Sequence, residues 1–154
     1  MTDGGPMVML GTAHGELCAA LHRDAFPEPE QWTAEAFTGL LSMPGVAGWV
    51  YTNHIGPAGL LLVRHCMDEA EILTVAVLPP FRRKGVARAL IEGSLTFLAG
   101  QGVTSLFLEV SVNNSPASAL YLALGFEDCG IRRSYYPDGS NARVMRHDLH
   151  SAIR

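Results

Sequence analysis

The stretch that most constrains the fold is residues 75–90, where an apolar run ends in two prolines, followed by three cationic residues, a glycine and an amphipathic segment. A central strand must end at Pro79 and Pro80, because neither residue can donate a hydrogen bond to the ladder. Gly85 lets the backbone approach a ligand more closely than any residue with a Cβ atom. The helix that follows would present free N–H groups and the positive end of its dipole to the loop. The stretch therefore predicts a strand, an anion-binding loop and a helix.

The cationic residues of this loop are Arg82, Arg83 and Lys84. Cations near the first turn destabilise a helix by roughly a few tenths of a kcal/mol or more, so a cluster of them favours a bound anion. A solvated basic loop is the alternative interpretation of the same residues.

The whole chain has 154 residues, of which 48% are hydrophobic, and this predicts one domain over residues 1–154. Its net charge of −4 and its pI near 5.8 argue against a general nucleic-acid binder, since duplex affinity depends on many Lys and Arg contacts to phosphate. The positive charge is local to the loop.

The three cysteines, Cys18, Cys66 and Cys129, are far apart and form no C-x-x-C pair, so neither a disulfide framework nor a zinc module is indicated. Cys18 and His22 lie one helical turn apart, but without further ligands nearby we expect ordinary packing and no metal. Residues 1–6 lack a basic segment with an apolar stretch behind it, and no window approaches about 18 consecutive apolar residues. We expect a soluble cytoplasmic protein that binds neither membrane nor nucleic acid.

Hydrophobic periodicity and turn residues predict the remaining elements. Helices are expected at residues 16–26, from an N-cap at Thr33 to Leu41, at residues 87–98, and from an N-cap at Ser115 to Leu124. Strands are expected at residues 8–10, 47–51, 58–63, 71–77, 104–110, 126–131 and 142–149. The order strand, helix, strand around the loop predicts a right-handed crossover between two parallel strands. The loop then lies at the carboxyl end of its strand, where open α/β sheets bind ligands.

The common nucleotide fingerprints GxxxxGK[ST] and GxGxxG are missing, as are hydrolase elbows and the HExxH zinc pattern. Arg82-x-x-Gly85-x-Ala87 instead resembles the [Q/R]-x-x-G-x-[G/A] motif of the GCN5-related N-acetyltransferases (the GNAT superfamily), which cradle the pyrophosphate of acetyl-CoA. The resemblance covers residues 72–149, about half of the chain. It includes Val77-Leu78-Pro79 and a second motif that runs from Asn114 through Ala119-Leu120-Tyr121 to Leu124-Gly125-Phe126.

This resemblance implies an α/β (α+β) GNAT fold. Its central sheet would be mixed and mostly antiparallel, flanked by helices, with one parallel βαβ pair splayed around the cofactor. It implies acetyl-CoA as co-substrate, and these residues as its contacts: Val75, Val77, Arg82, Arg83, Lys84, Gly85, Val86, Ala87, Asn114 and Tyr121.

Within the superfamily the chain is similar to the bacterial ribosomal-protein alanine N-acetyltransferases and their N-terminal acetyltransferase relatives. The closer match is carried by Leu108-Glu109-Val110 and by Ile131-Arg132-Arg133-x-Tyr135-Tyr136-Pro137. It implies an enzyme that acetylates the N-terminal α-amine of a protein or peptide, with an N-terminal alanine of a ribosomal protein as the expected acceptor. The alternatives are an enzyme acting on a small-molecule amine or a lysine side chain, and a binding module that holds acyl-CoA without turnover. The oligomeric state stays open.

Acetyl transfer needs a neutral amine and a proton for the departing thiolate, so a basic and an acidic group should flank the acetyl carbonyl. The resemblance implies Glu109 as the base, acting through water, and Tyr121 as the acid. A salt bridge to an arginine is the alternative role for Glu109, and a packed ring with a surface hydroxyl is the alternative for Tyr121.

The loop after residue 131 covers the peptide substrate in the family that the chain resembles, which implies substrate contacts from Tyr135, Tyr136 and Arg133. One of the two tyrosines is expected to fold back on the sheet edge. The arginines Arg132 and Arg133 either steer an acidic peptide or keep the edge soluble.

Overall fold

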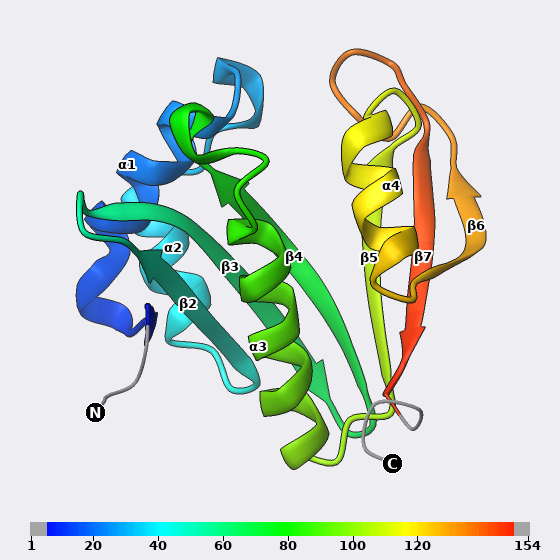
Figure 1. Ribbon diagram of the computed structural model, residues 1–154, viewed down its shortest axis with the longest axis horizontal. Helices are drawn as coiled ribbons and strands as arrows, with labels where there is room; N and C mark the ends of the chain where they lie inside the picture. The colour runs from blue at the N-terminus through cyan, green and yellow to red at the C-terminus, as the bar shows by residue number, and fades with distance from the viewer. Residues whose placement is uncertain (1–5, 150–154) are drawn as a thin grey trace. The chain divides into compact units, whose positions relative to one another are not determined.

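The computed structural model describes residues 6–149 (Figure 1). Its helices are α1 (Gly15–Ala25), α2 (Ala34–Leu41), α3 (Val86–Gly100) and α4 (Ser115–Ala123), with 3-10 turns at Thr12–His14, Glu28–Glu30 and Pro79–Phe81. Its strands are β1 (Met7–Met9), β2 (Val46–Thr52), β3 (Pro57–Cys66), β4 (Glu69–Val77), β5 (Ser105–Ser111), β6 (Glu127–Arg132) and β7 (Ala142–Asp148). The contacts divide these residues into two compact units, residues 6–64 with 73–94 and residues 65–72 with 95–149.

The first unit is built on the antiparallel strands β1, β2 and β3. Helices α1 and α2 lie against one face of β2 and β3, and the first turns of α3 cross the other face (Figure 1). The core between the two helices and the sheet includes Cys18, Phe37, Leu60 and Leu62, each fully buried. The expected N-cap of α2 is confirmed, because the Thr33 hydroxyl accepts a hydrogen bond from the Ala36 N–H at 3.1 Å.

His22 on α1 is part of this core and is 2% exposed. Its ring stacks on Phe26 and Trp32, with centroids 4.3 and 5.0 Å away. The Trp32 N–H donates to Nδ1 at 3.2 Å, so Nε2 carries the proton and donates to the Thr74 hydroxyl, also at 3.2 Å. Both ring nitrogens are therefore engaged by the protein.

A close approach between β3, β4 and the start of α3 fixes the region around the loop. A Cβ atom at Gly59 would lie 2.7 Å from the Ala76 carbonyl oxygen, closer than real side chains pack, and 3.1 Å from Val86 Cγ1, which is tighter than most such contacts. Gly59 thus allows the strand end and the helix start to lie directly on β3.

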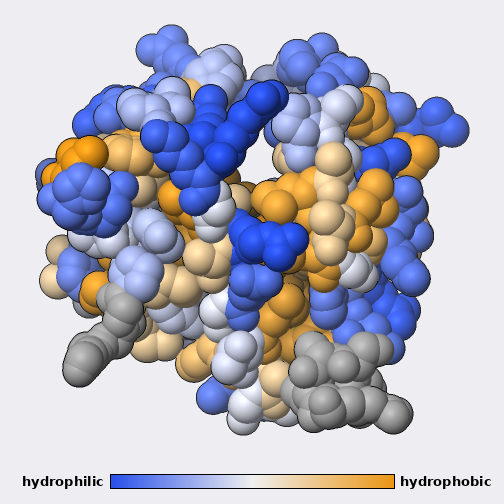
Figure 2. All heavy atoms as spheres, in the orientation of Figure 1, coloured by the Kyte–Doolittle hydropathy of each residue, from blue (hydrophilic) through white to orange (hydrophobic). Residues whose placement is uncertain are grey.

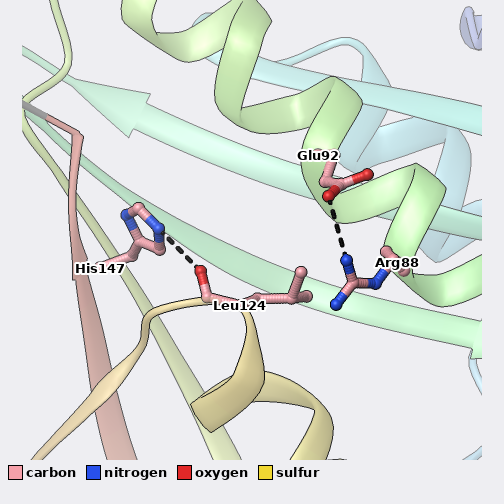
Figure 3. Close-up of polar contacts among 4 residues, drawn as sticks. All are labelled: Arg88, Glu92, Leu124 and His147. Carbon is pink, nitrogen blue, oxygen red and sulfur yellow. Dashed lines mark hydrogen bonds and ion pairs between the residues drawn. The ribbon is translucent and has the colours of Figure 1, made fainter. Parts of the chain in front are cut away.

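The second unit contains the antiparallel strands β5, β7 and β6, with β7 in the middle. Leu106, Leu108 and Val110 alternate along β5 as its buried face, and α4 lies on one side of this sheet (Figure 1). His147 on β7 donates from Nε2 to the Leu124 carbonyl oxygen at 3.0 Å (Figure 3). Its Nδ1 is buried and has no hydrogen-bond partner among residues 6–149.

All seven strands form one hydrogen-bonded sheet in the order β1-β2-β3-β4-β5-β7-β6. The parallel pair is β4 with β5, registered from Glu69–Ser105 to Glu71–Phe107. This confirms the predicted fold class, a mixed and mostly antiparallel sheet with one parallel pair and flanking helices. The expectation of a single domain stays a prediction.

The predicted N-cap of α4 is wrong by one residue. Asn114, not Ser115, caps the helix, since its Oδ1 accepts from the Ala117 N–H at 3.2 Å and its carbonyl oxygen accepts from the Ser118 N–H at 3.0 Å. Both residue types are good caps, and the side chain that reaches the third helical N–H decides between them. Pro116 consequently occupies the second helical position.

Candidate functional site: an anion loop and a buttressed carboxylate

The loop before α3 has the backbone of an anion site. Arg83 (φ 63°) and Gly85 (φ 83°) adopt left-handed conformations on either side of Lys84. Where left-handed and right-handed residues follow one another, their consecutive N–H groups point into the same concavity, which can hold an anion. The first helical hydrogen bond runs from the Ala89 N–H to the Gly85 carbonyl oxygen at 3.0 Å, so the amides before Ala89 have no acceptor within the helix. The loop can therefore offer several N–H donors to one phosphate group.

The side chain of Arg82 holds this loop in place. Its Nε donates to the Val77 carbonyl oxygen at 2.9 Å, and its Nη2 donates to the Ala25 carbonyl oxygen at 3.1 Å. These bonds tie the loop to the end of β4 and to the end of α1. The remaining guanidinium N–H groups are free to meet an anion.

Strongly hydrophilic side chains gather over the segment between β4 and α3 (Figure 2), where Arg83 and Lys84 are exposed. One turn into α3, Arg88 and Glu92 form an ion pair of 3.5 Å (Figure 3). Both side chains of this pair are about half exposed, so the pair contributes little to stability.

Val75 and Val77, two further predicted cofactor contacts, alternate along β4 with the buried residues Thr74 and Ala76. Thr74 bonds His22, and Ala76 belongs to the core under α1 and α2. Val75 and Val77 therefore point to the opposite face of the strand, where they are half-buried. Their contact with a cofactor stays a prediction.

In the second unit, Glu109 lies on the face of β5 opposite to Leu108 and Val110. Its carboxylate forms an ion pair with Arg132 of β6, and its side chain is 25% exposed against 61% for Arg132. The structure therefore has the salt bridge to an arginine that was the alternative role for Glu109. The sequence predictions included Arg133 and not Arg132 among the substrate contacts, so this partner was missed.

The Tyr135 hydroxyl is the second partner of Glu109. This hydrogen bond, with partial burial, raises the pKa of Tyr135 above its usual value. The Arg132 guanidinium lies 5.7 Å from the centroid of the Tyr135 ring, within the range of a cation–π contact. Tyr136 is half-buried and packs edge-on against Tyr135 at 5.0 Å, so Tyr135 is the more exposed of the two.

Ser140 closes the loop that carries these tyrosines. Its carbonyl oxygen accepts from the N–H groups of Tyr135 and Tyr136 at 3.0 and 3.2 Å. Its hydroxyl lies 2.6 Å from Asp138 Oδ1 and 3.0 Å from the Ser111 hydroxyl. Hydrogen bonds from Ser140 lower the pKa of Asp138. The Ser140 proton then goes to the carboxylate, and Ser111 donates to Ser140, so the loop is tied to β5.

Tyr121 on α4 is 6% exposed and packs edge-on against Phe126 at 5.8 Å. Burial raises the pKa of Tyr121 to about 12, so its hydroxyl is protonated at neutral pH and available as a donor. Phe126 in turn packs on His147 of β7. The side chain of His147 lies on one face of the sheet, and the side chain of Glu109 lies on the other. Glu109 and Tyr121 thus belong to opposite faces of the β5–β7–β6 sheet.

Cys18 and His22 both lie in the core of the first unit. Cys18 is fully buried, burial raises the pKa of its thiol to about 11, and both nitrogens of His22 are hydrogen-bonded. Across residues 6–149, no group of three or more His, Cys, Asp or Glu side chains is arranged to hold a metal ion. Within the same range no helix combines the length and apolarity needed to span a membrane.

Residues 15–126 match the family model described as acetyltransferase (GNAT) family. Three curated relatives are similar over different lengths. An uncharacterized protein of Mycobacterium leprae (strain TN) is 36% identical over 95% of this chain and 42% of its own length. The [ribosomal protein bS18]-alanine N-acetyltransferase of Escherichia coli (strain K12) is 42% identical over 57% of this chain and 61% of its own length. The N-alpha-acetyltransferase RimI of Mycobacterium tuberculosis is 35% identical over 90% of this chain and 89% of its own length.

The alignments with the first two relatives thus span 42% and 61% of those proteins. Among solved structures, the ribosomal-protein-S18-alanine N-acetyltransferase from Escherichia coli superposes with a TM-score of 0.85 at 30% identity. The superposition covers 93% of this chain and 92% of that protein.

Proposed function

This chain belongs to the acetyltransferase (GNAT) family, as the sequence motifs predicted, and we propose that it transfers an acetyl group from acetyl-CoA to the N-terminal α-amine of a protein. An N-terminal alanine of a ribosomal protein is the expected acceptor, because the E. coli relative carries that activity in its name. The proposal places the protein in the cytoplasm, with a protein N-terminus as its partner.

The observation that carries the proposal is the left-handed turn at Arg83 and Gly85 directly before α3. It supports a pyrophosphate-binding role, because its amides are not used by the helix and its side chains are cationic. The donor would be held by Arg82, Arg83, Lys84, Gly85, Val86 and Ala87, with Val75, Val77 and Asn114 as further contacts. No metal is required for this chemistry.

In the proposed reaction, Glu109 and Tyr121 act on the thioester from opposite faces of β5. The protonated acceptor amine first loses a proton to Glu109 through a water molecule. The amine nitrogen then attacks the thioester carbonyl, so that an N–C bond forms and the C–S bond breaks. The thiolate leaves with the electron pair of that bond and takes a proton from the Tyr121 hydroxyl. The new amide nitrogen loses its surplus proton to water, and a proton from water restores the Tyr121 hydroxyl. Burial keeps the Tyr121 hydroxyl protonated at neutral pH, as the role of donor requires, and also makes it a weaker acid, so its proton moves only as the negative charge on the sulfur develops.

The choice of an α-amine over a lysine is supported by proton energetics. An α-amine has a pKa near ~8 and lysine one near ~10.4, so neutralising lysine at pH 7 requires roughly 3 kcal/mol more. One carboxylate acting through water is a modest base and suits the less basic amine.

The test measures thiol release when acetyl-CoA is mixed with an alanine-initiated ribosomal peptide. The matched control is the same peptide with a blocked N-terminus and a free lysine. Release with the first peptide alone supports the proposal, and release with the second alone favours a lysine acetyltransferase. Tight CoA binding by calorimetry without thiol release for any amine would favour a binding module.

Two variants separate the assigned roles. Tyr121→Phe should lower kcat at least about tenfold and leave the Kd for CoA within about twofold, because it removes only the proton donor. Gly85→Val should weaken CoA binding, because a β-branched residue cannot easily adopt a φ of 83°. Equal loss of binding and turnover in both variants would contradict these roles.

A further inference from the structure

In the structure a cation already pairs with the carboxylate that the proposed reaction uses as base. The Arg132 guanidinium pairs with Glu109 Oε2, and the Tyr135 hydroxyl bonds the same carboxylate. The cation therefore lies between a carboxylate and an aromatic ring. These are the two kinds of group that best bind an ammonium ion.

The strand register explains why Arg132 reaches this position. Glu109 lies opposite Val144, and Arg132 lies opposite Ala142, so all four side chains are on one face of the sheet. Glu109 and Arg132 are two strands apart, which is roughly 10 Å. Arg132 must therefore extend across β7, and the fully buried Ala142 presents only a methyl group in its path.

The acceptor of the proposed reaction arrives mostly as an ammonium ion, because an α-amine has a pKa near ~8. It must give its proton to Glu109 and so must come within reach of a carboxylate that Arg132 holds. Two cations then compete for one anion. The pair is easily broken, since Arg132 is 61% exposed and such pairs contribute little to stability.

We propose that the position of the Arg132 guanidinium, beside the Glu109 carboxylate and the Tyr135 ring, is the subsite for the acceptor ammonium, and that Arg132 fills it until the acceptor displaces it. This inference rests on the proposed function for the identity of the acceptor. Arg132 acts as an internal competitor: it compensates the Glu109 charge in the free protein and raises the acceptor concentration needed for binding.

The experiment measures the Kd of a short alanine-initiated peptide for the protein–CoA complex by calorimetry. Arg132→Gln should tighten binding about fivefold, the upper end of what a partly exposed ion pair contributes. Arg132→Lys keeps a tethered cation and should stay close to the wild-type value. A purely structural role for Arg132 predicts weaker binding in both variants.

Two controls isolate the ammonium. The same peptide with an acetylated N-terminus lacks the α-ammonium, so its Kd should not change in Arg132→Gln. Arg143→Gln removes another arginine of the same hairpin, one that pairs with Asp128 at 2.9 Å on the opposite face, and should leave the Kd unchanged. In a Glu109→Gln background, Arg132→Gln should lose its effect.

Unchanged or weaker binding in Arg132→Gln overturns the inference, as does failure of the peptide to bind any variant. If Arg132→Gln tightens binding but no variant releases thiol from acetyl-CoA, acetyl transfer is refuted and the cation subsite stands. If thiol is released normally and Arg132→Gln has no effect on Kd, the subsite is refuted and acetyl transfer stands.

Discussion

Acidification should destabilise the first unit through one residue, His22. Its ring is 2% exposed and enclosed by aromatic rings, and burial lowers the pKa of this imidazole from 6.5 to about 4. Both nitrogens have partners that suit the neutral form, because Nδ1 accepts from the Trp32 N–H. A proton on Nδ1 would face a donor and would place a charge in an apolar core.

The magnitude follows from the two pKa values. Between pH 6.5 and pH 4 the unfolded chain binds a proton at His22 that the folded chain does not, so stability falls as the pH falls through this window. Integrated from pH 7 to pH 4, the loss is about 3 kcal/mol. At about 2–4 °C per kcal/mol, this one group would lower the Tm by roughly 6–12 °C.

Urea unfolding followed by circular dichroism at several pH values between 7 and 4 measures this loss. The control is the double variant His22→Phe/Thr74→Val, which keeps a ring at the site and removes the titrating group with its hydroxyl partner. Carboxylates titrate in both proteins, so the difference between their pH profiles reports His22. The double variant should lose about 3 kcal/mol less on acidification.

The reasoning is refuted if both proteins lose the same free energy over this range. It is also refuted if the His22 imidazole titrates near its usual pKa of about 6.5 in an NMR experiment on the folded protein.

Two further stability predictions concern single positions. Gly125→Ala should lower the free energy of unfolding by about 1–3 kcal/mol, because φ is 101° there and a Cβ atom would lie 3.1 Å from His147 Nε2; urea unfolding checks this, and an unchanged midpoint would contradict it. Arg82→Met should lower the free energy of unfolding, measured without ligand, by about 1–2 kcal/mol, because two hydrogen bonds to main-chain carbonyls are lost. Arg83→Met changes an exposed neighbour and should alter the free energy of unfolding little. Equal loss in both arginine variants would show that Arg82 is not the brace of the loop.

Local sequence signals predicted the elements of the fold well. These signals extend over only a few residues each: the apolar periodicity of the amphipathic segment that forms α3, the Thr33 cap, and the prolines after β4. The structure has each of them in place. The cap of α4 was misplaced because Asn114 and Ser115 are chemically equivalent candidates. Only the helix geometry distinguishes them.

Arg132 could not be predicted from the sequence as the partner of Glu109, for a different reason. An irregularity between Asp128 and Gly130 adds one residue to β6 and shifts its register against β7. Without it, Arg132 would point to the opposite face, since a shift of one residue reverses every side chain of a strand. The ion pair between Glu109 and Arg132 therefore depends on a β-bulge that no sequence motif predicts.

The loop residues could be proposed from sequence because a turn, its glycine and the following helix are contiguous. The role of the Arg82 side chain could not, because one of its acceptors, the carbonyl of Ala25, is distant in sequence. Hydrogen bonds between distant segments depend on the assembled fold.

Gly59 changes how variants of this protein should be interpreted. A methyl group there would collide with the Ala76 carbonyl oxygen at the end of β4 and would press on Val86, so the end of β4 would have to shift and the start of α3 would have to adjust with it. The amides at the start of α3 are the proposed hydrogen-bond donors to the phosphate. A screen for cofactor affinity would therefore identify a Gly59 variant as a weak binder, although residue 59 does not contact the ligand. A map of binding hot spots drawn from such a screen would include a residue whose only contribution is the absence of a side chain.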